Sequence, residues 1–311
     1  MKPAAGTVGL LGLGIMGSAM SANLLRAGFA VSGYDIVPAL RARLRRAGGH
    51  AARSVAEVAR RAPIIVTSLP SAAALMEVAE AIAGLRRRGQ VVVETSTLPL
   101  ADKQAAQRVL ARAGVILLDC PLSGTGAQAR TKDLVVFASG PRAAQRRCRA
   151  VFDGFARAQH DLGAFGNGSK MKFVANLLVA IHNVSAAEAF TLARKAGLDA
   201  AQVLRVVGDG AGGSRMFSVR GPMMVAGDYS DATMKVEVWQ KDMKIIAEFA
   251  AALDCPTPLF AASAPLYAAA MAAGRAREDT AAVCAVLGEM AGLGPRKQRP
   301  RRKTTRRRAR R

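Results

Sequence analysis

Residues 7–35 read TVGLLGLGIMGSAMSANLLRAGFAVSGYD, and this stretch decides the fold. Residues 7–11 predict a strand, 16–27 a helix and 30–34 a second strand. The glycine-rich turn GLGIMG, residues 12–17, joins the first strand to the helix. This order is typical of a dinucleotide-binding βαβ unit, in which the phosphates lie at the positive end of the helix.

The residues of this turn have predicted roles in holding a dinucleotide. Gly12 permits the tight turn, Gly14 lets the backbone approach a pyrophosphate, and Gly17 lets the helix pack on its strand. Asp35 ends the second strand, where its carboxylate can accept hydrogen bonds from ribose hydroxyls and repel a 2′-phosphate. NAD is therefore favoured, and NADP stays open because two arginines follow. The alternative is a glycine-rich turn without a ligand. The predicted cofactor-binding residues of this unit are Gly12, Leu13, Gly14, Ile15, Met16, Gly17 and Asp35.

Size and composition limit the class of protein. The chain has 311 residues, of which 51% are hydrophobic, enough for two domains with separate cores. No uncharged run of 18 apolar residues occurs, so we expect no membrane span. The predicted strand begins too early for a signal or transit peptide, and four widely spaced cysteines predict reduced thiols. Three scattered histidines give no metal-ligand pattern. These features predict a cytoplasmic protein without a metal.

About half of the net charge of +23 lies at the C-terminus. Residues 295–311 read PRKQRPRRKTTRRRARR, with eleven basic and no acidic residues. The rest of the chain has 34 basic and 22 acidic residues, a net charge of +12. The tail lacks apolar residues to bury, so we expect it to be disordered and to bind polyanions nonspecifically.

Apolar strand candidates alternate with alanine-rich amphipathic segments through the first half. This pattern predicts an α/β fold with an N-terminal Rossmann-type, doubly wound parallel sheet. Ligands of such sheets bind beyond the carboxyl ends of the strands, so Leu69 and Pro70 are also predicted to contact the cofactor. The further predicted strands are 64–68, 91–94, 115–119 and 134–139, and the helices between them include 39–47, 71–82 and 102–113.

The pattern changes after the glycine-rich residues 163–168. Residues 169–196 contain no proline and predict a helix about 40 Å long, at 1.5 Å per residue. Further predicted helices at 200–207, 233–253, 258–273 and 280–291 make the second half mainly α. We therefore expect a dinucleotide-binding domain at 1–165, a C-terminal all-α substrate or dimerisation domain at 166–293, and the basic tail at 294–311.

Lys172 and Asn176 lie four residues apart and share one face of the predicted long helix. Lys170 points about 160° away from Lys172. A lysine and an amide that project together near a domain junction can bind a substrate hydroxyl and carry its proton. By spacing alone, however, a solvated surface lysine is the more ordinary interpretation.

Four motifs occur in an order that resembles the β-hydroxyacid dehydrogenase family, which includes 3-hydroxyisobutyrate dehydrogenase, tartronate semialdehyde reductase and glyoxylate/succinic semialdehyde reductases. The resemblance covers residues 6–293. The motifs are GLGIMG, DCPLSGTGAQARTKDL at 119–134, GNGSKMKFVAN at 166–176 and WQKDMKI at 239–245. Such a relationship implies a small carboxylate substrate, hydride exchange with a nicotinamide cofactor, and a homodimer or homotetramer.

The resemblance also implies roles for single residues. Lys172 matches the general acid/base of the family. Thr97 matches a residue near the nicotinamide, and Lys241 is expected to contact the cofactor or substrate. The residues that the resemblance assigns to substrate binding are Ser123, Gly124, Thr125, Asn176 and Asp242. A lysine suits proton transfer when burial and nearby positive charge lower its pKa toward the working pH.

Two other interpretations remain open at the level of sequence. One is a noncatalytic binding protein with a dehydrogenase fold and a nucleic-acid-binding tail, which has no need of Lys172. The other is an imine reductase, whose relatives typically lack a lysine at this position. A hydrolase is disfavoured because Ser123 has no G-x-S-x-G context and Cys120 has no identifiable histidine partner.

Overall fold

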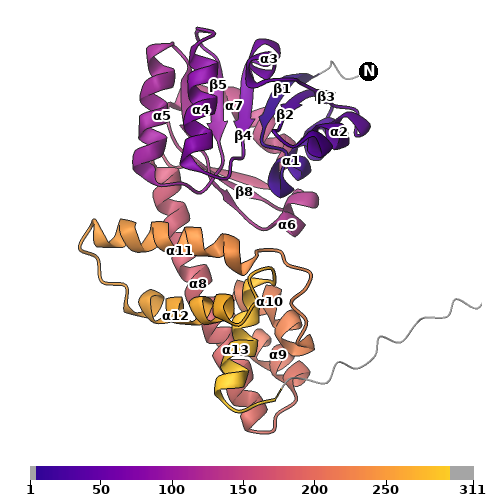
Figure 1. Cartoon of the computed structure of the whole chain (residues 1–311), viewed down its shortest axis with the longest axis vertical. Coiled ribbons are helices and arrows are strands. Elements are labelled where there is room, and N and C mark those ends of the chain that lie inside the picture. The colour runs from indigo at the N-terminus through magenta and orange to yellow at the C-terminus, as the bar shows by residue number, and fades with distance from the viewer. Residues whose placement is uncertain (1–4, 295–311) are drawn as a thin grey trace, which may run out of the picture. The chain divides into compact units, whose positions relative to one another are not determined.

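The computed structural model describes residues 5–294 (Figure 1). The predicted basic tail, residues 295–311, lies outside the described residues. The described residues form two compact units, one of residues 5–178 with 238–258, and one of residues 179–237 with 259–294. Helix α8, Asn167–Lys195, begins next to the predicted domain boundary, and its first turns, up to residue 178, lie in the sheet-containing unit.

The first unit contains a six-stranded parallel sheet. Its strand order, β3-β2-β1-β4-β5-β6, is the doubly wound order, with the switch point between β1 and β4. The predicted fold class is confirmed. The strands are β1 Ala5–Leu11, β2 Phe29–Tyr34, β3 His50–Ala51, β4 Ile64–Thr67, β5 Val91–Glu94 and β6 Ile116–Asp119.

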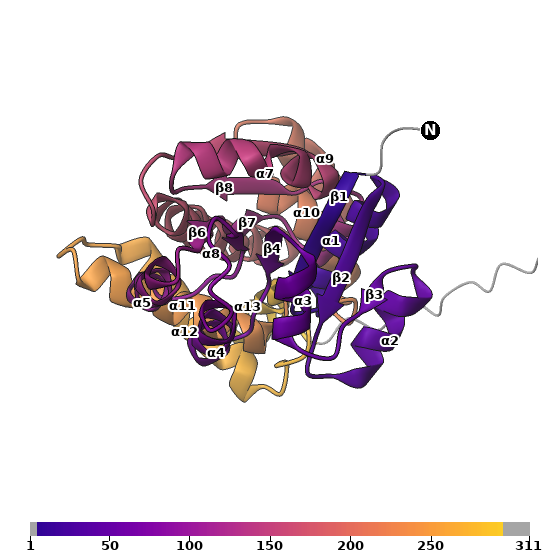
Figure 2. The same ribbon diagram turned by 90° about the horizontal axis from the view of Figure 1, so that it is seen from above.

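Helices cover both faces of this sheet (Figure 2). On one face Ile65, Val92 and Leu117 pack with α3, α4 and α5, and on the other face their neighbours in sequence pack with α1 and α7. Adjacent strand residues thus enter opposite cores, as the two-residue period of a strand requires. The helices are α1 Ile15–Arg26, α2 Pro38–Arg46, α3 Val55–Arg61, α4 Ala72–Ala83, α5 Leu100–Arg112 and α7 Arg142–Phe155.

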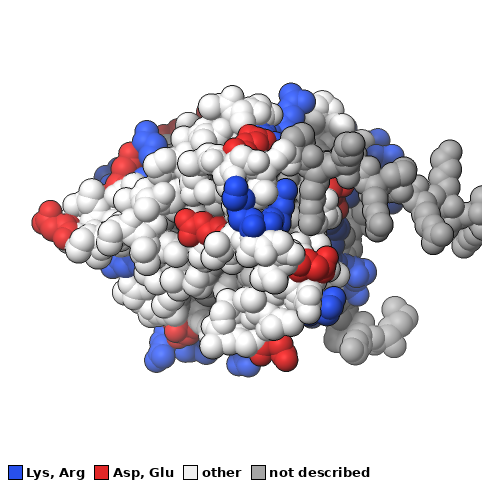
Figure 3. Space-filling view, turned by 90° about the horizontal axis from the view of Figure 1, so that it is seen from below, with Lys and Arg blue, Asp and Glu red and all other residues white. Residues whose placement is uncertain are grey.

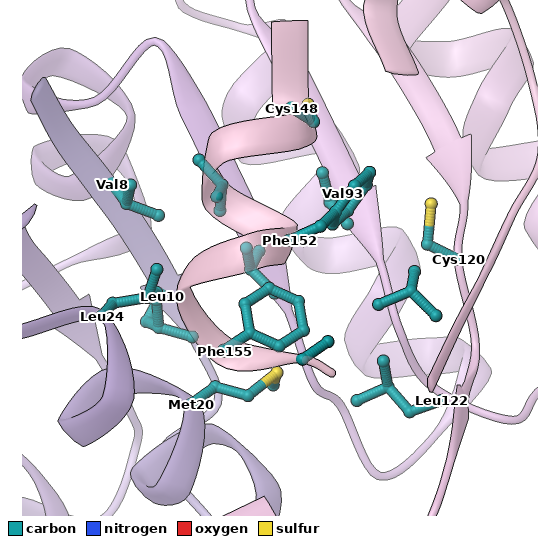
Figure 4. Packing of buried hydrophobic residues seen from close by; sticks show 14 of the residues in the cluster. Val8, Leu10, Met20, Leu24, Val93, Cys120, Leu122, Cys148, Phe152 and Phe155 are labelled. Carbon is teal, nitrogen blue, oxygen red and sulfur yellow. The ribbon is translucent and has the colours of Figure 1, made fainter. Parts of the chain in front are cut away.

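Two aromatic side chains of α7 fill the core on the second face. Phe152 and Phe155 are buried and make an edge-to-face pair, with ring centroids 6.2 Å apart. Figure 4 shows them between Leu10 of the sheet, Met20 of α1 and Leu122. This packing fixes α1, whose N-terminal turn is the predicted phosphate site.

The expectation that residues 134–139 continue the parallel sheet is wrong. Strand β8, Val135–Ala138, belongs to a separate three-stranded sheet between β7, Leu122–Ser123, and β9, Ala158–Asp161. It pairs antiparallel with β7 because only the short helix α6, Gly126–Arg130, lies between them. A parallel return needs a crossover of a dozen residues or more.

The second unit is helical, in agreement with the predicted mainly α second half. Phe190 and Phe217 stack at its centre, with ring centroids 5.1 Å apart. Helix α11, Val236–Ala251, begins in this unit, but its residues from 238 onward belong to the first unit. The other elements of the second unit are α9 Ala200–Asp209, α10 Arg215–Ala226, α12 Pro258–Ala272, the 3-10 turn Thr280–Ala282 and α13 Val283–Met290.

In residues 5–294, α8 is the one helix long and apolar enough to cross a membrane by length and composition alone. Its most apolar window has a mean hydropathy of 1.4, and 44% of that window is buried within the protein. The core helix of a water-soluble protein passes the same test, so α8 is weak evidence for a span.

Candidate active site

The glycine turn after β1 has the shape of a phosphate-binding turn. Gly12 has a φ of +88°, and a Cβ on it would lie 2.1 Å from the Ser68 carbonyl oxygen. A Cβ on Gly17 would lie 1.9 Å from the Gly12 carbonyl oxygen. By contrast, no atom lies within 4 Å of a Cβ built on Gly14. The turn is thus closed toward the protein and open at Gly14, at the N-terminus of α1, which fits a pyrophosphate.

Asp35 lies beside this turn. Its Oδ2 accepts a hydrogen bond from the Leu13 N–H at 2.7 Å, and its Oδ1 accepts one from the Val37 N–H at 2.8 Å. The Arg41 guanidinium donates to the Asp35 carbonyl oxygen and lies 5.5 Å from the centre of the Tyr34 ring. The carboxylate is therefore oriented toward the glycine turn, while the arginine is held by backbone and ring.

The segment 123–126 packs against the same turn. A Cβ on Gly126 would lie 2.5 Å from Cγ2 of Ile15, so the two loops are in close contact. Asn23 of α1 donates from Nδ2 to the Ala129 carbonyl oxygen at 2.7 Å and fixes helix α6 on α1. Gly126 therefore lies next to the glycine turn, and the predicted substrate-binding residues Ser123, Gly124 and Thr125 directly precede it in the chain.

Helix α8 begins against the end of β6. A Cβ on Gly168 would lie 2.4 Å from the Phe137 carbonyl oxygen and 2.6 Å from that of Asp119. Only glycine allows this approach. Lys172 lies about one helical turn farther along α8, and so near the carboxyl edge of the sheet.

The surroundings of Lys172 favour its neutral form. The pKa of this half-buried lysine is lowered to about 8: burial is the largest cause, Asp242 opposes the shift, and Lys241 adds to it. A group with a pKa of this value exchanges its proton readily near neutral pH, which is what a general acid/base requires.

Helix α11 contributes two further predicted residues, Lys241 and Asp242, to the surroundings of Lys172. Asn176 donates from Nδ2 to Asp242 Oδ2 at 2.9 Å, and both side chains are buried. Lys241 lies with Nζ 3.1 Å from Asp242 Oδ1 and donates to the Thr97 carbonyl oxygen. A continuous set of contacts thus joins α8, α11 and the loop after β5, and Phe173 packs against Phe249 of α11.

Leu69 also lies at this edge, where its N–H donates to Ser96 Oγ at 2.8 Å. Pro70 is exposed beside it. Cys120 is fully buried, and burial raises the pKa of its thiol well above the ordinary value, so it is not an activated nucleophile. All four cysteines are free, as predicted.

Three charged residues at this edge were not predicted from the sequence. Glu94, Lys103 and Asp119 are fully buried, and Lys103 contacts both carboxylates. The sequence does contain a signal for the burial of Lys103, because this lysine shares the buried face of α5 with Ala106 and Leu110. A lysine three and seven residues before buried apolar positions is itself expected to be buried.

The doubly wound sheet, the phosphate turn and the half-buried lysine define a dinucleotide-dependent oxidoreductase. A family model described as the NAD binding domain of 6-phosphogluconate dehydrogenase matches residues 7–166. A second, described as NAD-binding of NADP-dependent 3-hydroxyisobutyrate dehydrogenase, matches residues 166–287. The chain belongs to the β-hydroxyacid dehydrogenase family, and it is a nicotinamide-dependent oxidoreductase of hydroxyacids.

Individual relatives agree over nearly the whole chain. L-threonate dehydrogenase of Cupriavidus necator is 34% identical over 284 residues, which are 90% of this chain and 95% of that protein. The structure of 3-hydroxyisobutyrate dehydrogenase from Salmonella typhimurium is 33% identical, covers 91% of this chain and 100% of its own, and has a TM-score of 0.81. The structure of 3-hydroxyisobutyrate dehydrogenase from Mycobacterium tuberculosis with L-serine is 28% identical, covers 90% of this chain and 98% of its own, and has a TM-score of 0.82.

Proposed function

We propose that this protein interconverts a small β-hydroxyacid and its semialdehyde or keto acid, with Lys172 as the general acid/base. The observation that carries this proposal is a half-buried lysine with a pKa of about 8, one turn into a helix that begins against the end of β6. The family membership supports the same role. A noncatalytic binding protein would not need such a group.

In this proposal the loop of Ser123, Gly124 and Thr125 binds the substrate carboxylate. Asn176, oriented by its hydrogen bond to Asp242, contacts the substrate hydroxyl. Lys172 accepts the hydroxyl proton in oxidation and returns it in reduction. The cofactor, when bound, supplies the hydride acceptor or donor. Gly12 to Gly17, Asp35, Leu69, Pro70, Thr97 and Lys241 are the residues that we propose to hold it.

The substrate class can be tested directly with a panel of acids. We propose 3-hydroxyisobutyrate, threonate and glycerate as candidate alcohols, and glyoxylate and succinic semialdehyde as candidate carbonyl substrates. The absorbance of the reduced cofactor gives the rate with NAD and with NADP. Turnover of at least one small hydroxyacid is expected, whereas turnover of cyclic imines alone would overturn the proposal.

Asp35 should set a preference for NAD over NADP. Its oriented carboxylate would face a 2′-phosphate, and removal of that charge relieves the repulsion. In Asp35→Asn the ratio of kcat/KM for NAD to that for NADP should fall by roughly tenfold or more, about 1.4 kcal/mol. The amide keeps an acceptor for the Leu13 N–H, so the turn should survive. A wild-type enzyme with the higher kcat/KM for NADP would contradict this assignment.

We also propose a cytoplasmic homodimer or homotetramer. Met171, Val174 and Leu178 of α8 support the assembly, because they are large, apolar and exposed and share a face at helical spacing. Light scattering of the purified protein measures the state directly. A monomer at micromolar concentration would exclude it.

The basic tail is proposed to bind polyanions without a role in catalysis. Truncation after Gly294 should leave kcat within about twofold of the full chain, because residues 295–311 offer no large apolar side chains for docking. The affinity for duplex DNA should fall sharply, and in the full chain it should weaken steeply with salt. Loss of activity in a folded truncated protein would place the tail in the active assembly.

Polyanion binding that survives truncation would point to the body of the protein. The best candidate for such a binding surface is a set of exposed arginines at the amino ends of the strands. Arg87 donates hydrogen bonds to the Ala59 and Arg60 carbonyl oxygens, and Arg147 donates one to the Gly89 carbonyl oxygen. The described residues on the face in Figure 3 instead carry separate basic and acidic side chains on a mainly uncharged surface.

A further inference from the structure

Three charged side chains are buried together at the carboxyl ends of β5 and β6, and the proposed chemistry does not use them. Lys103 Nζ lies 2.6 Å from Glu94 Oε2 and 2.8 Å from Asp119 Oδ1, and none of the three side chains is exposed. The two carboxylates converge because Glu94 and Asp119 are register partners on adjacent strands. Burial opposes the charged form of Lys103, but the carboxylates outweigh it and raise its pKa.

Such a buried triad adds little to the free energy of unfolding. Desolvation of the charges cancels most of their mutual attraction, and apolar residues of similar volume are often as stabilising or more so. Charged groups do better at holding polar backbone groups in one position, because hydrogen bonds to an ionised partner are shorter and stronger. The contacts of the two carboxylates therefore show what the triad controls.

Glu94 controls the loop after β5. Its Oε1 accepts a hydrogen bond from the Ser96 N–H at 2.8 Å, and Ser96 Oγ accepts one from the Leu69 N–H at 2.8 Å. The next residue, Thr97, accepts a hydrogen bond from Lys241 through its carbonyl oxygen. One carboxylate thus fixes two loops that border the proposed cofactor site.

Asp119 controls the start of α8. Its Oδ2 accepts from the Ser169 N–H at 2.7 Å, and its Oδ1 accepts from Ser169 Oγ at 2.8 Å. Ser169 precedes Lys172 by three residues, so this contact sets the position of the turn that carries it. The triad has a net charge of −1 and lies at the positive end of the 29-residue helix α8, whose dipole stabilises it.

We propose that Lys103 is a positioning residue for the hydride-transfer reaction. Its ammonium group lies against both Glu94 and Asp119 and holds the two carboxylates in place, and through them it holds the loop at Ser96 and the first turn of α8. This inference rests on the proposed role of Lys172. It places Lys103 outside contact with the reacting atoms, so the lysine acts only through the groups that it orients.

The test compares Lys103→Met with the double variant Glu94→Gln/Lys103→Met. In the single variant two carboxylates face each other without a counter-ion, and displacement of the site should lower kcat by roughly 10- to 100-fold while the Kd of the cofactor stays within about threefold. Two such carboxylates share a proton, with one pKa strongly raised. The deficit relative to wild type should therefore grow as the pH rises and both ionise.

The second substitution should rescue the first. Glu94→Gln removes one charge and keeps an acceptor for the Ser96 N–H, so the double variant should regain at least about threefold in kcat, with a deficit independent of pH. Arg108 is an exposed basic residue on the same helix, so Arg108→Met is the matched control and should retain wild-type kcat. If Lys103→Met fails to fold, the double variant is compared with Glu94→Gln alone and should have a kcat roughly three- to tenfold lower.

Two results would overturn the proposal. One is a folded Lys103→Met with kcat within about threefold of wild type at every pH. The other is a double variant no better than the single one, or, where the single variant does not fold, equal to Glu94→Gln. Lys172→Ala is measured in the same assay. Wild-type kcat in Lys172→Ala would reject the proposed function, while the rescue would still report on Lys103.

Discussion

Lys172→Ala should lower kcat by roughly 10² to 10⁴-fold and leave the Kd of the cofactor within about threefold, because general acid/base catalysis contributes about this much. The alanine variant removes the half-buried group with the lowered pKa and leaves the glycine turn untouched. Steady-state rates with the best substrate of the panel give kcat, and fluorescence titration with the reduced cofactor gives Kd.

Lys170→Ala is the matched control. Lys170 is exposed and lies two residues away on the same helix, on another face. Its removal should change kcat by less than about threefold. Equal and mild losses in the two variants would exclude Lys172 as the acid/base.

The second large effect is expected on stability, at a buried ion pair of the helical unit. Arg220 Nε lies 3.0 Å from Asp279 Oδ1, and Asp279 also accepts hydrogen bonds from the Thr233, Met234 and Ala281 N–H groups. Asp279→Asn would leave the buried Arg220 without a counter-charge. The expected cost is about 3–5 kcal/mol in the free energy of unfolding of this unit.

Urea unfolding followed by far-UV circular dichroism measures this loss, and Asp231→Asn, at an exposed position, should change stability by less than about 0.5 kcal/mol. The partners of Asp279 lower its pKa below 3.8. Its contribution is therefore complete above that pH and is lost as the pH falls through the lower folded-state pKa. An Asp279→Asn protein as stable as wild type at pH 7 would contradict the account.

The sequence predicted the sheet well because its signals are local. The glycine turn, the apolar runs and the helix before Asp35 each depend on neighbouring residues, and the structure has them within one or two residues. Strand β3 was missed because two residues carry no period. Helix α10 was missed because Gly221 and Pro222 interrupt its interior.

Features that depend on distant residues could not be predicted in the same way. The segment 134–139 is a strand, but its sheet is decided by the short connection to β7, which the apolar pattern does not show. The contact between Asn176 and Asp242 joins two residues that are 66 positions apart in sequence. Likewise, the convergence of Glu94 and Asp119 on Lys103 follows only from the register of β5 and β6.

The central claim is that Lys172 carries the substrate proton, and the pH dependence of kcat/KM in both directions tests it most directly. Oxidation needs the neutral lysine, so kcat/KM should rise about tenfold per pH unit and level off above a pKa of about 8. Reduction needs the protonated lysine, so kcat/KM should be level below that pKa and fall above it. In Lys172→Ala both limbs should vanish between about pH 6 and 9. Profiles that slope alike in the two directions, or that persist in Lys172→Ala, would contradict the assignment.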